Sequence, residues 1–143
     1  MRRSSIPPGV AQRIRSAARH RCGYCLSPQH LVMARLEIEH IIPLAQGGSH
    51  AESNLWLACP LCNAHKSSKI DEIDPVSGLR VPLFNPRMQV WHEHFAWVNG
   101  GLSIAGLTPI GRATVVALHL NTDQDALTVR SYWILAGWHP PSD

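Results

Sequence analysis

The residues of this chain best suited to chemistry lie within and beside two Cys-x-x-Cys pairs. The pairs are Cys22/Cys25 and Cys59/Cys62, and together they hold all four cysteines of the sequence. Four thiolates at tetrahedral corners hold structural zinc in many proteins, and each Cys-x-x-Cys turn supplies two of them. The alternative is two disulfide bonds in a secreted protein. Because no apolar run typical of a signal peptide follows Arg2 and Arg3, we expect a reducing cytoplasm and a zinc site.

A second set of polar residues is enclosed by the pairs or abuts them. It consists of Glu39-His40, Asn54 and Asn63. Carboxylate and amide oxygens are hard ligands suited to Mg²⁺ or Mn²⁺, and two such protein ligands leave positions for water and phosphate oxygens. An imidazole with a pKa near 6.5 suits a general base at neutral pH. The pattern therefore predicts two metal sites, a closed one for zinc and an open, oxygen-rich one for hydrolysis.

The elements that must position these residues can be predicted from hydrophobic periodicity and turn signals. The arginine-rich segment 11–20 has an apolar face and predicts a helix. Alternation over 36–40 predicts a strand that Pro43 ends, and 54–59 predicts a second strand. Pro60 opens a short helix to about residue 69. The order is strand, loop, strand, helix.

The C-terminal half carries weaker signals. We expect a short strand over 81–84, a hairpin formed by 91–98 and 102–107, and a helix capped by Thr108 that runs to about 118. Asp123 is expected to cap a last helix that ends before Gly137. The length fits a single domain over 1–143, with a core at 10–70 and a C-terminal extension at 71–143 packed on it.

This order of residues resembles the HNH endonuclease family, also called the ββα-metal nucleases. The resemblance covers residues 22–66 and rests on Cys22-x-x-Cys25, Glu37-Ile38-Glu39-His40-Ile41-Ile42-Pro43, Gly47-Gly48, Asn54-Leu55 and Cys59-Pro60-Leu61-Cys62-Asn63-Ala64-His65-Lys66. Segments 82–87, 91–95 and 106–115 look like a C-terminal extension of one bacterial subgroup. The fold class implied is α+β: a small ββα-metal (His-Me finger) unit with structural zinc, an N-terminal helix, and a C-terminal hairpin plus helices.

The resemblance implies a role for each matching residue. His40 would be the general base, Asn54 would brace the loop between the strands, and Glu39 and Asn63 would bind the catalytic ion. The implied reaction is hydrolysis of DNA phosphodiester bonds, which leaves a 5′-phosphate and a 3′-hydroxyl. Two residues depart from the commonest pattern. Glu39 stands where the family more often has Asp, and Asn63 stands where it often has His, which favours Mg²⁺ over zinc at the active site.

The strand that carries Glu39 raises a geometric question. Glu37 shares its face, so either carboxylate can approach the metal, whereas His40 belongs to the opposite face. We therefore expect the strand to twist or end near His40.

The charge of the chain points to a polyanionic partner. The formal net charge is +3, and arginines cluster near the N-terminus. We predict nucleic-acid contacts at Arg13, Arg15, Arg19, Arg21, Lys66 and Lys69, with a solvated surface as the alternative for each. The partner expected is DNA, with RNA as a second candidate. Cutting both strands with one site needs a homodimer or two encounters, so the oligomeric state stays open.

Two other classes of function compete with the nuclease. A non-catalytic zinc-ribbon nucleic-acid-binding module needs the cysteines but not Glu39, His40 and Asn63 together. A zinc-stapled protein-interaction domain needs neither that set nor the arginines. We interpret His65 as a surface histidine, and the His92/His94 pair as surface or packing residues rather than metal ligands. No segment approaches the ~18–20 continuous apolar residues of a membrane span.

Overall fold

The computed structural model describes residues 6–142, so the expectations for Arg2 and Arg3 lie outside the described residues. The chain divides between Ser68 and Lys69 into two compact units. The first unit carries the cysteines and the candidate catalytic residues, and the second carries the C-terminal extension. Both units mix helices with two-stranded sheets, so the predicted α+β class is confirmed.

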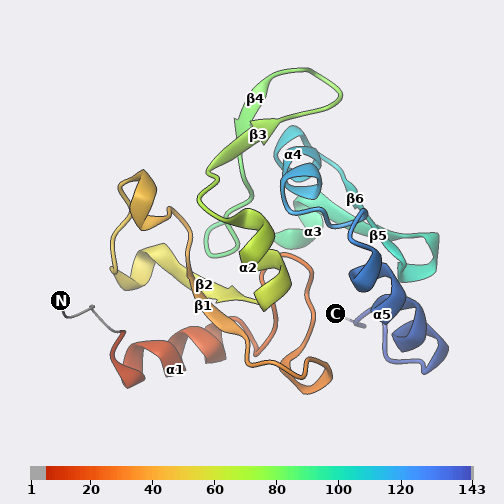
Figure 1. Cartoon of the computed structure of the whole chain (residues 1–143), viewed down its shortest axis with the longest axis horizontal. Coiled ribbons are helices and arrows are strands. Elements are labelled where there is room, and N and C mark those ends of the chain that lie inside the picture. Colours follow the sequence, from red (N-terminus) through yellow and green to blue (C-terminus); the bar gives the residue numbers. More distant parts are fainter. Residues whose placement is uncertain (1–5, 143) are drawn as a thin grey trace. The chain divides into compact units, whose positions relative to one another are not determined.

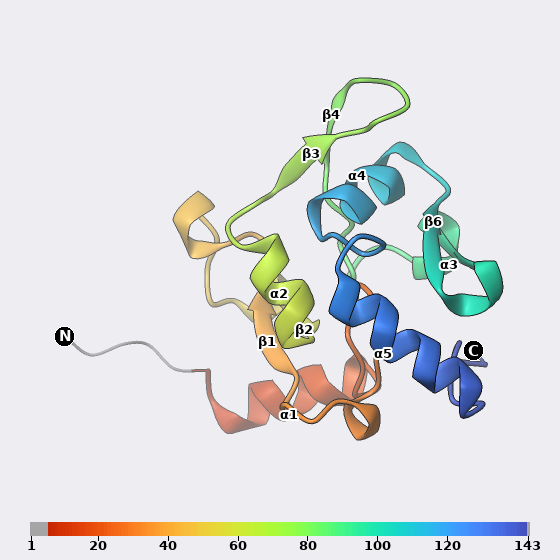
Figure 2. The ribbon, with the colours of Figure 1, turned by 45° about the vertical axis from the view of Figure 1, so that its right-hand side comes forward.

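The first unit is built around a short antiparallel hairpin (Figure 1). In this hairpin Glu37 pairs with Ala58, and His40 pairs with Leu55. The unit contains, in chain order, α1 (Pro8–Ala17), a 3₁₀ turn (Gln29–Leu31), β1 (Glu37–His40), 3₁₀ turns at Leu44–Gln46 and Glu52–Asn54, β2 (Leu55–Ala58) and α2 (Pro60–Lys66). Helix α1 packs on β2 and helix α2 packs on β1, and Figure 2 shows α2 lying along the hairpin. The predicted order of strand, loop, strand and helix is confirmed.

Helix boundaries in this unit differ from the prediction by a few residues. Helix α1 begins at Pro8 because proline is favoured in the first helical turn, where its missing N–H costs nothing. It ends at Ala17, since Arg19 and His20 have left-handed backbone conformations with φ of 57° and 54°. Helix α2 ends at Lys66 rather than near residue 69, because Ser67 has a φ of 52°.

The hydrophobic core of the first unit lies where α1 meets the hairpin. Ile14 on α1 and both Leu55 and Leu57 on β2 are completely buried. Leu36, just before β1, is also buried. The apolar face that the arginine-rich segment was predicted to present is therefore used to cover β2.

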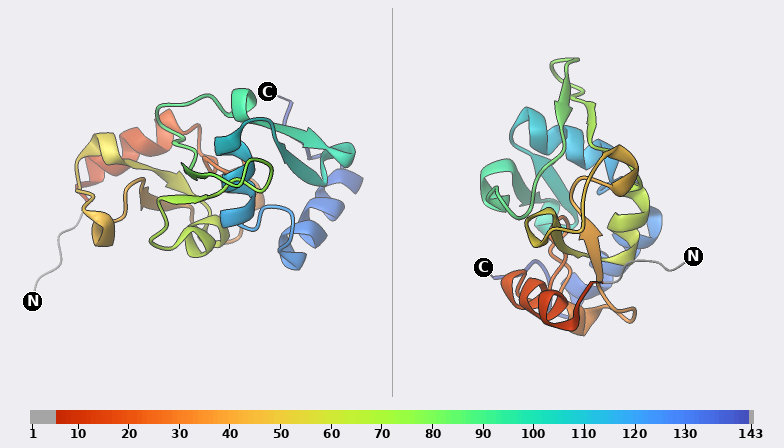
Figure 3. Two further views of the ribbon diagram at one scale, coloured as in Figure 1. Left: turned by 90° about the horizontal axis from the view of Figure 1, so that it is seen from above. Right: turned by 90° about the vertical axis from the view of Figure 1, so that its left-hand side faces the viewer.

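The second unit packs around α4 (Pro109–Ala117). Helix α4 contacts β6, β3 and β4, and Figure 3 shows the β3–β4 hairpin extending from the rest of this unit. The Thr108 hydroxyl accepts a hydrogen bond from the Gly111 N–H, which is the predicted N-cap. The other elements are β3 (Asp71–Ile73), β4 (Arg80–Pro82), α3 (Trp91–His94), β5 (Phe95–Val98), a 3₁₀ turn (Asn99–Gly101), β6 (Ser103–Gly106) and α5 (Gln124–Leu135).

The second unit differs from the prediction in two places. Strand β3 was not predicted, because the segment 71–73 is acidic and becomes a strand only by pairing with β4. Residues 91–94, predicted as the start of a strand, form a helical turn instead. The hairpin itself is present as β5 and β6, and Asp123 caps α5 by accepting a hydrogen bond from the Ala126 N–H.

A buried ion pair holds the β3–β4 hairpin to α4. The Asp74 side chain is fully buried, and its two oxygens accept from the Arg112 guanidinium at 2.8 and 2.9 Å. The backbone N–H groups of Val76 and Ser77 donate to the same carboxylate. The Arg112 guanidinium beside it holds the pKa of the Asp74 carboxyl well below its usual range.

This ion pair predicts an acid sensitivity. A depressed carboxyl pKa contributes stability that is fully present above the unfolded value of about 3.9 and is lost as pH falls toward the folded value. Asp74→Asn should therefore destabilise the second unit at pH 7, and the gap to wild type should shrink below about pH 4. Urea unfolding at pH 7 and pH 3, followed by tryptophan fluorescence, measures it. The matched control is Asp71→Asn, which removes an exposed pair with Arg80 and should have little effect. A gap of equal size at both pH values would contradict this account.

Candidate functional site

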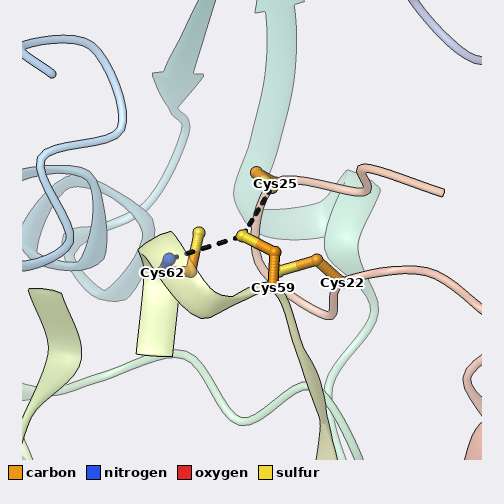
Figure 4. A group of neighbouring side chains, drawn as sticks. All are labelled: Cys22, Cys25, Cys59 and Cys62. Carbon is orange, nitrogen blue, oxygen red and sulfur yellow. Dashed lines mark hydrogen bonds between the residues drawn. The ribbon is translucent and has the colours of Figure 1, made fainter. Parts of the chain in front are cut away.

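The four cysteines come from two separate parts of the first unit and meet at one point (Figure 4). Cys22 and Cys25 lie in the turn after α1. Cys59 follows β2, and Cys62 lies in the first turn of α2. The N–H of Gly23 donates to Leu57 O at 2.9 Å, which ties the first turn to β2. All four cysteines are buried and none forms a disulfide bond.

The geometry of the thiols fits a zinc ion. All four Sγ atoms lie within 4.8 Å of one another, and Cys25 Sγ lies 3.7 Å from Cys59 Sγ. A tetrahedral site with Zn–S bonds of about 2.3 Å has sulfur–sulfur edges of about 3.8 Å. The N–H of Tyr24 donates to Cys22 Sγ and the N–H of Cys62 donates to Cys59 Sγ, both at 3.4 Å, as expected around thiolate ligands. The cluster is therefore positioned to bind a metal, and sulfur ligands in this arrangement favour zinc.

The burial and pKa shifts of the cysteine thiols favour a bound cation at the cluster. Burial raises the pKa of the Cys22 thiol well above its usual value, whereas hydrogen bonds from the neighbouring thiols lower the pKa of Cys25. Burial therefore opposes the loss of the proton from the Cys22 thiol in the absence of a cation. A dication stabilises the deprotonated form of all four ligands, which couples metal binding to the folding of this unit.

Glu39 points into the interior of the unit. Only 2 % of the residue is exposed, and one carboxylate oxygen accepts a hydrogen bond from the Tyr24 hydroxyl. The other oxygen, Oε2, lies 3.5 Å from the ammonium of buried Lys66, an ion-pair distance at which it accepts no hydrogen bond. Burial raises the pKa of the Glu39 carboxyl, and the Lys66 charge opposes that shift.

Lys66 also holds the backbone at the end of β1. Its ammonium donates to His40 O at 3.0 Å and to Ile41 O at 2.9 Å. This differs from the prediction that Lys66 contacts nucleic acid, because a side chain with only 3 % exposure is not presented to a phosphate. The structure gives Lys66 the role of joining the last turn of α2 to the segment around His40.

Asn63 lies one turn earlier on the same face of α2. Its side-chain N–H donates to Glu37 Oε1 at 2.8 Å. Glu37 is exposed and, as strand alternation requires, shares a face of β1 with Glu39. Both carboxylates of β1 therefore contact α2. Glu37 accepts from the Asn63 amide, and Glu39 pairs with the Lys66 ammonium.

Asn54 crosslinks the loop between the two strands. Its Oδ1 accepts from the Ile42 N–H at 2.8 Å, and its Nδ2 donates to Ile42 O and to Ser49 O at 2.9 Å each. Gly48 lies beneath this crosslink, where a Cβ would fall 1.7 Å from Ile42 O. The loop can therefore close only with glycine at this position.

His40 is the last residue of β1 and is half-buried. Its Nε2 lies 3.1 Å from Nδ1 of His50, and the two rings meet edge to face. Partial burial lowers the pKa of His40, and the charges of His50 and Lys66 lower it further. The lowered pKa favours the neutral imidazole, which is the form that can accept a proton.

The other predicted basic contacts fall in different surroundings. Arg13 is exposed and forms an ion pair with Glu52 at 2.7 Å. Arg15 is half-buried and donates to Leu36 O at 2.8 Å. Arg19 is exposed and Arg21 is half-buried. Lys69 belongs to the second unit, where it donates to Ala117 O.

The histidines interpreted as surface or packing residues lie on two helices, α2 and α3. His65 is half-buried on α2. His92 and His94 lie on the helical turn α3 rather than on a strand, and His94 Nδ1 lies 2.6 Å from the Thr108 hydroxyl. Among residues 6–142, the cysteine cluster is the one group of three or more potential His, Cys, Asp or Glu ligands that come close enough to share an ion.

Sequence reasoning missed two contributors to the site. Tyr24 lies between two cysteines and was given no role, yet its hydroxyl reaches Glu39. His50 lies in a glycine- and serine-containing loop and was given no role either, yet its ring contacts His40. The signal available for Tyr24 was a large aromatic residue inside a four-residue metal turn, and for His50 there was none.

The hairpin, the following helix and the four thiols together define a ββα unit with a cysteine cluster positioned to bind a metal. Residues 22–69 match the family model described as HNH endonuclease, so this part of the chain is an HNH endonuclease domain. The resemblance read from the sequence is confirmed over this range. Comparison with curated proteins and with solved structures found no match. Among the described residues, no helix is both long and apolar enough to cross a membrane.

The thiol cluster predicts the metal content of the protein. Purified wild-type chain should carry about one zinc per molecule, and chelation should abolish the cooperative unfolding of the first unit. Cys25→Ser should lose the zinc, because three thiolates and a hydroxyl bind it far more weakly. Native mass spectrometry with elemental analysis measures the stoichiometry.

Ser27→Ala serves as the matched control for this prediction. The Ser27 hydroxyl lies 3.0 Å from Cys25 Sγ but is not a ligand, so this variant should retain its zinc with reduced affinity. Recovery of the wild type without metal and with paired cysteines would overturn the assignment.

Proposed function

We propose that this protein is a divalent-metal-dependent endonuclease that hydrolyses phosphodiester bonds of DNA. The products proposed are a 5′-phosphate and a 3′-hydroxyl. The observation that carries the proposal is the half-buried imidazole of His40 at the last position of β1, the strand that also carries Glu37 and Glu39, within an HNH domain.

His40 is the proposed general base. Its Nδ1 makes no hydrogen bond among the described residues, so it is available to take a proton from an attacking water. The O–H bond of that water breaks, its proton binds Nδ1, and the oxygen attacks phosphorus opposite the 3′-oxygen. The bond between phosphorus and the 3′-oxygen then breaks, and the leaving oxygen takes a proton from solvent to become the 3′-hydroxyl. Because the neutral imidazole is the active form and its pKa is lowered, the base remains functional somewhat below the usual histidine pKa of about 6.5.

The oxygen donors of β1 and α2 suit a hard divalent ion. The set contains the carboxylates of Glu39 and Glu37 and the amide of Asn63, which are ligands of the kind that Mg²⁺ and Mn²⁺ prefer. Glu39 Oε2 accepts no hydrogen bond but lies 3.5 Å from the Lys66 ammonium, so an ion bound there would compete with that pair. We propose Glu39 and Asn63 as the protein ligands, with Glu37 as the competing carboxylate. When bound, such an ion neutralises charge on the scissile phosphate and on the leaving oxygen.

The proposed substrate and setting follow from charge and cysteine chemistry. Exposed Arg13 and Arg19, with Arg15 and Arg21 nearby in sequence, are the candidates to follow a phosphate backbone, so affinity should fall as salt rises. DNA is the proposed partner, and RNA is the second candidate. Four free thiols suit a reducing cytoplasm. A homodimer is the proposed form if both strands are cut.

The competing function is a zinc-ribbon module that binds nucleic acid without catalysis. The buried ion pair of Glu39 with Lys66 favours this alternative, since the pair gives Glu39 a structural partner that competes with a metal. The two functions make opposite statements about His40, because a binding module has no use for a proton acceptor there.

The first prediction concerns His40. In Mg²⁺ or Mn²⁺, wild type should nick supercoiled plasmid, and His40→Ala should be slower by about 10²–10⁴-fold, as expected for loss of a general base. The rate should rise with pH to a plateau, and the midpoint of that rise should lie below about pH 6.5.

The control is His30→Ala, which removes an exposed histidine of the same unit and should leave the rate unchanged. Equal nicking by wild type and His40→Ala would sink the role of His40, and absence of cleavage of DNA and RNA with every metal would favour the binding module.

The second prediction concerns the ion. Asn63→Ala and Glu39→Gln should each raise the Mg²⁺ concentration for half-maximal nicking by at least about tenfold. Glu37→Gln, which keeps a partner for Asn63, should raise it less. Thermal unfolding must be followed in parallel, because Glu39→Gln leaves the buried Lys66 charge uncompensated at a cost of about 3–5 kcal/mol. A larger effect in Glu37→Gln than in Glu39→Gln would transfer the ligand role to Glu37.

A further inference from the structure

We propose that His50 is a positioning residue for His40. The proposal deepens the function above and rests on it. The Nε2 atom of His40 lies 3.1 Å from Nδ1 of His50, and this is the one hydrogen bond that the His40 ring makes among residues 6–142. The rings meet edge to face, with centroids 5.0 Å apart and planes at 69°. A half-buried imidazole with one partner is held in one ring orientation only while that partner stays in place.

The backbone beside His50 is itself fixed. The preceding carbonyl, Ser49 O, accepts from Asn54 Nδ2 at 2.9 Å, and the Ser49 hydroxyl accepts from the Ala51 N–H at 3.2 Å. The same Asn54 amide bonds both the N–H and the carbonyl of Ile42, two residues after His40. One side chain therefore holds the chain next to His40 and the chain next to His50, and fixes their separation.

The direction of this hydrogen bond determines which nitrogen of His40 is left to accept a proton. With Nε2–H of His40 donating to Nδ1 of His50, the Nδ1 atom of His40 carries the lone pair that accepts a proton. The reverse tautomer would place a proton on His40 Nδ1 and remove that lone pair. When its Nδ1 is the acceptor, His50 holds both the ring orientation and the tautomer of His40 that a general base at this position requires.

The isosteric variants of histidine give a sharp test. Asn places Oδ1 where the Nδ1 of histidine lies, whereas Gln places its oxygen near the Nε2 position. His50→Asn should therefore retain the hydrogen bond to His40 Nε2–H, and both His50→Gln and His50→Ala should lose it. His50 is exposed, so none of the three substitutions should change the melting temperature appreciably.

The experiment is single-turnover and steady-state cleavage of a fluorescent DNA duplex in Mg²⁺ by the zinc-loaded full chain. We expect kcat to fall about three- to tenfold in His50→Ala and His50→Gln, to stay near wild type in His50→Asn, and KM to remain constant in all three. His30→Ala is again the matched control.

The outcomes separate this inference from the proposed function. Cleavage by wild type, loss in His40→Ala and an unchanged kcat in His50→Ala would overturn the role of His50 alone. A change confined to KM would also overturn it, since it would make His50 a DNA contact. Equal loss in the Asn and Gln variants would show that the hydrogen bond at the Nδ1 position is not what matters. An inactive wild type would overturn the proposed function, and this inference with it.

Discussion

The contact on which the first unit depends is the meeting of four thiols from two distant turns. A backbone hydrogen bond from the Gly23 N–H to Leu57 O is another link between the turn after α1 and β2. With a zinc ion held there, the ends of the β1–β2 hairpin are fixed, and α2 starts from a defined position against β1. A hairpin of four-residue strands and a helix of two turns are too small to be stable on their own. A metal held by the four thiols supplies the stability that the small core of this unit lacks.

The cysteine cluster is also connected to the candidate catalytic residues by a short polar chain. Tyr24, inside the first metal turn, donates to Glu39, and Glu39 pairs with Lys66 at the end of α2. Lys66 in turn holds the carbonyls of His40 and Ile41. A buried ion pair of this kind contributes little net stability compared with apolar packing, but it fixes the register of α2 against β1 because every other alignment leaves a buried charge unpaired. Loss of zinc is therefore expected to disturb the position of His40 as well as the fold.

Sequence reasoning recovered the elements whose signals are local. Alternation over 36–40, proline at the start of α2 and the capping residues Thr108 and Asp123 each determine their element through nearby chemistry, and the structure contains all of them. Strand β3 was not predicted because its residues have no intrinsic preference for a strand. They form one only because they pair with β4. The turn α3 escaped because aromatic residues in 91–98 favour a strand on average, while tertiary packing of Trp91 against Phe95 supports a helical turn.

The part of the site that could be predicted is the part that depends on the type and spacing of its residues. The cysteines, His40, Asn54 and Asn63 could be picked out from type and spacing. The direction of each side chain could not, because it depends on which neighbour satisfies it. Glu39 was predicted to bind the catalytic ion and Lys66 to contact nucleic acid, yet both are buried and form an ion pair with each other. The contact between His40 and His50 depends on the closed form of a loop that Gly48 and Asn54 make possible.

The central claim is that this domain holds two different metals at two separate sites. Anomalous X-ray diffraction from crystals grown with Mn²⁺, recorded at the zinc and manganese absorption edges, tests it most directly. The account predicts a zinc peak about 2.3 Å from each of the four Sγ atoms and a manganese peak beside Asn63 and a carboxylate of β1. Zinc density absent from the thiols, or no manganese density between β1 and α2 in a crystal whose DNA-binding face is open to solvent, would contradict it.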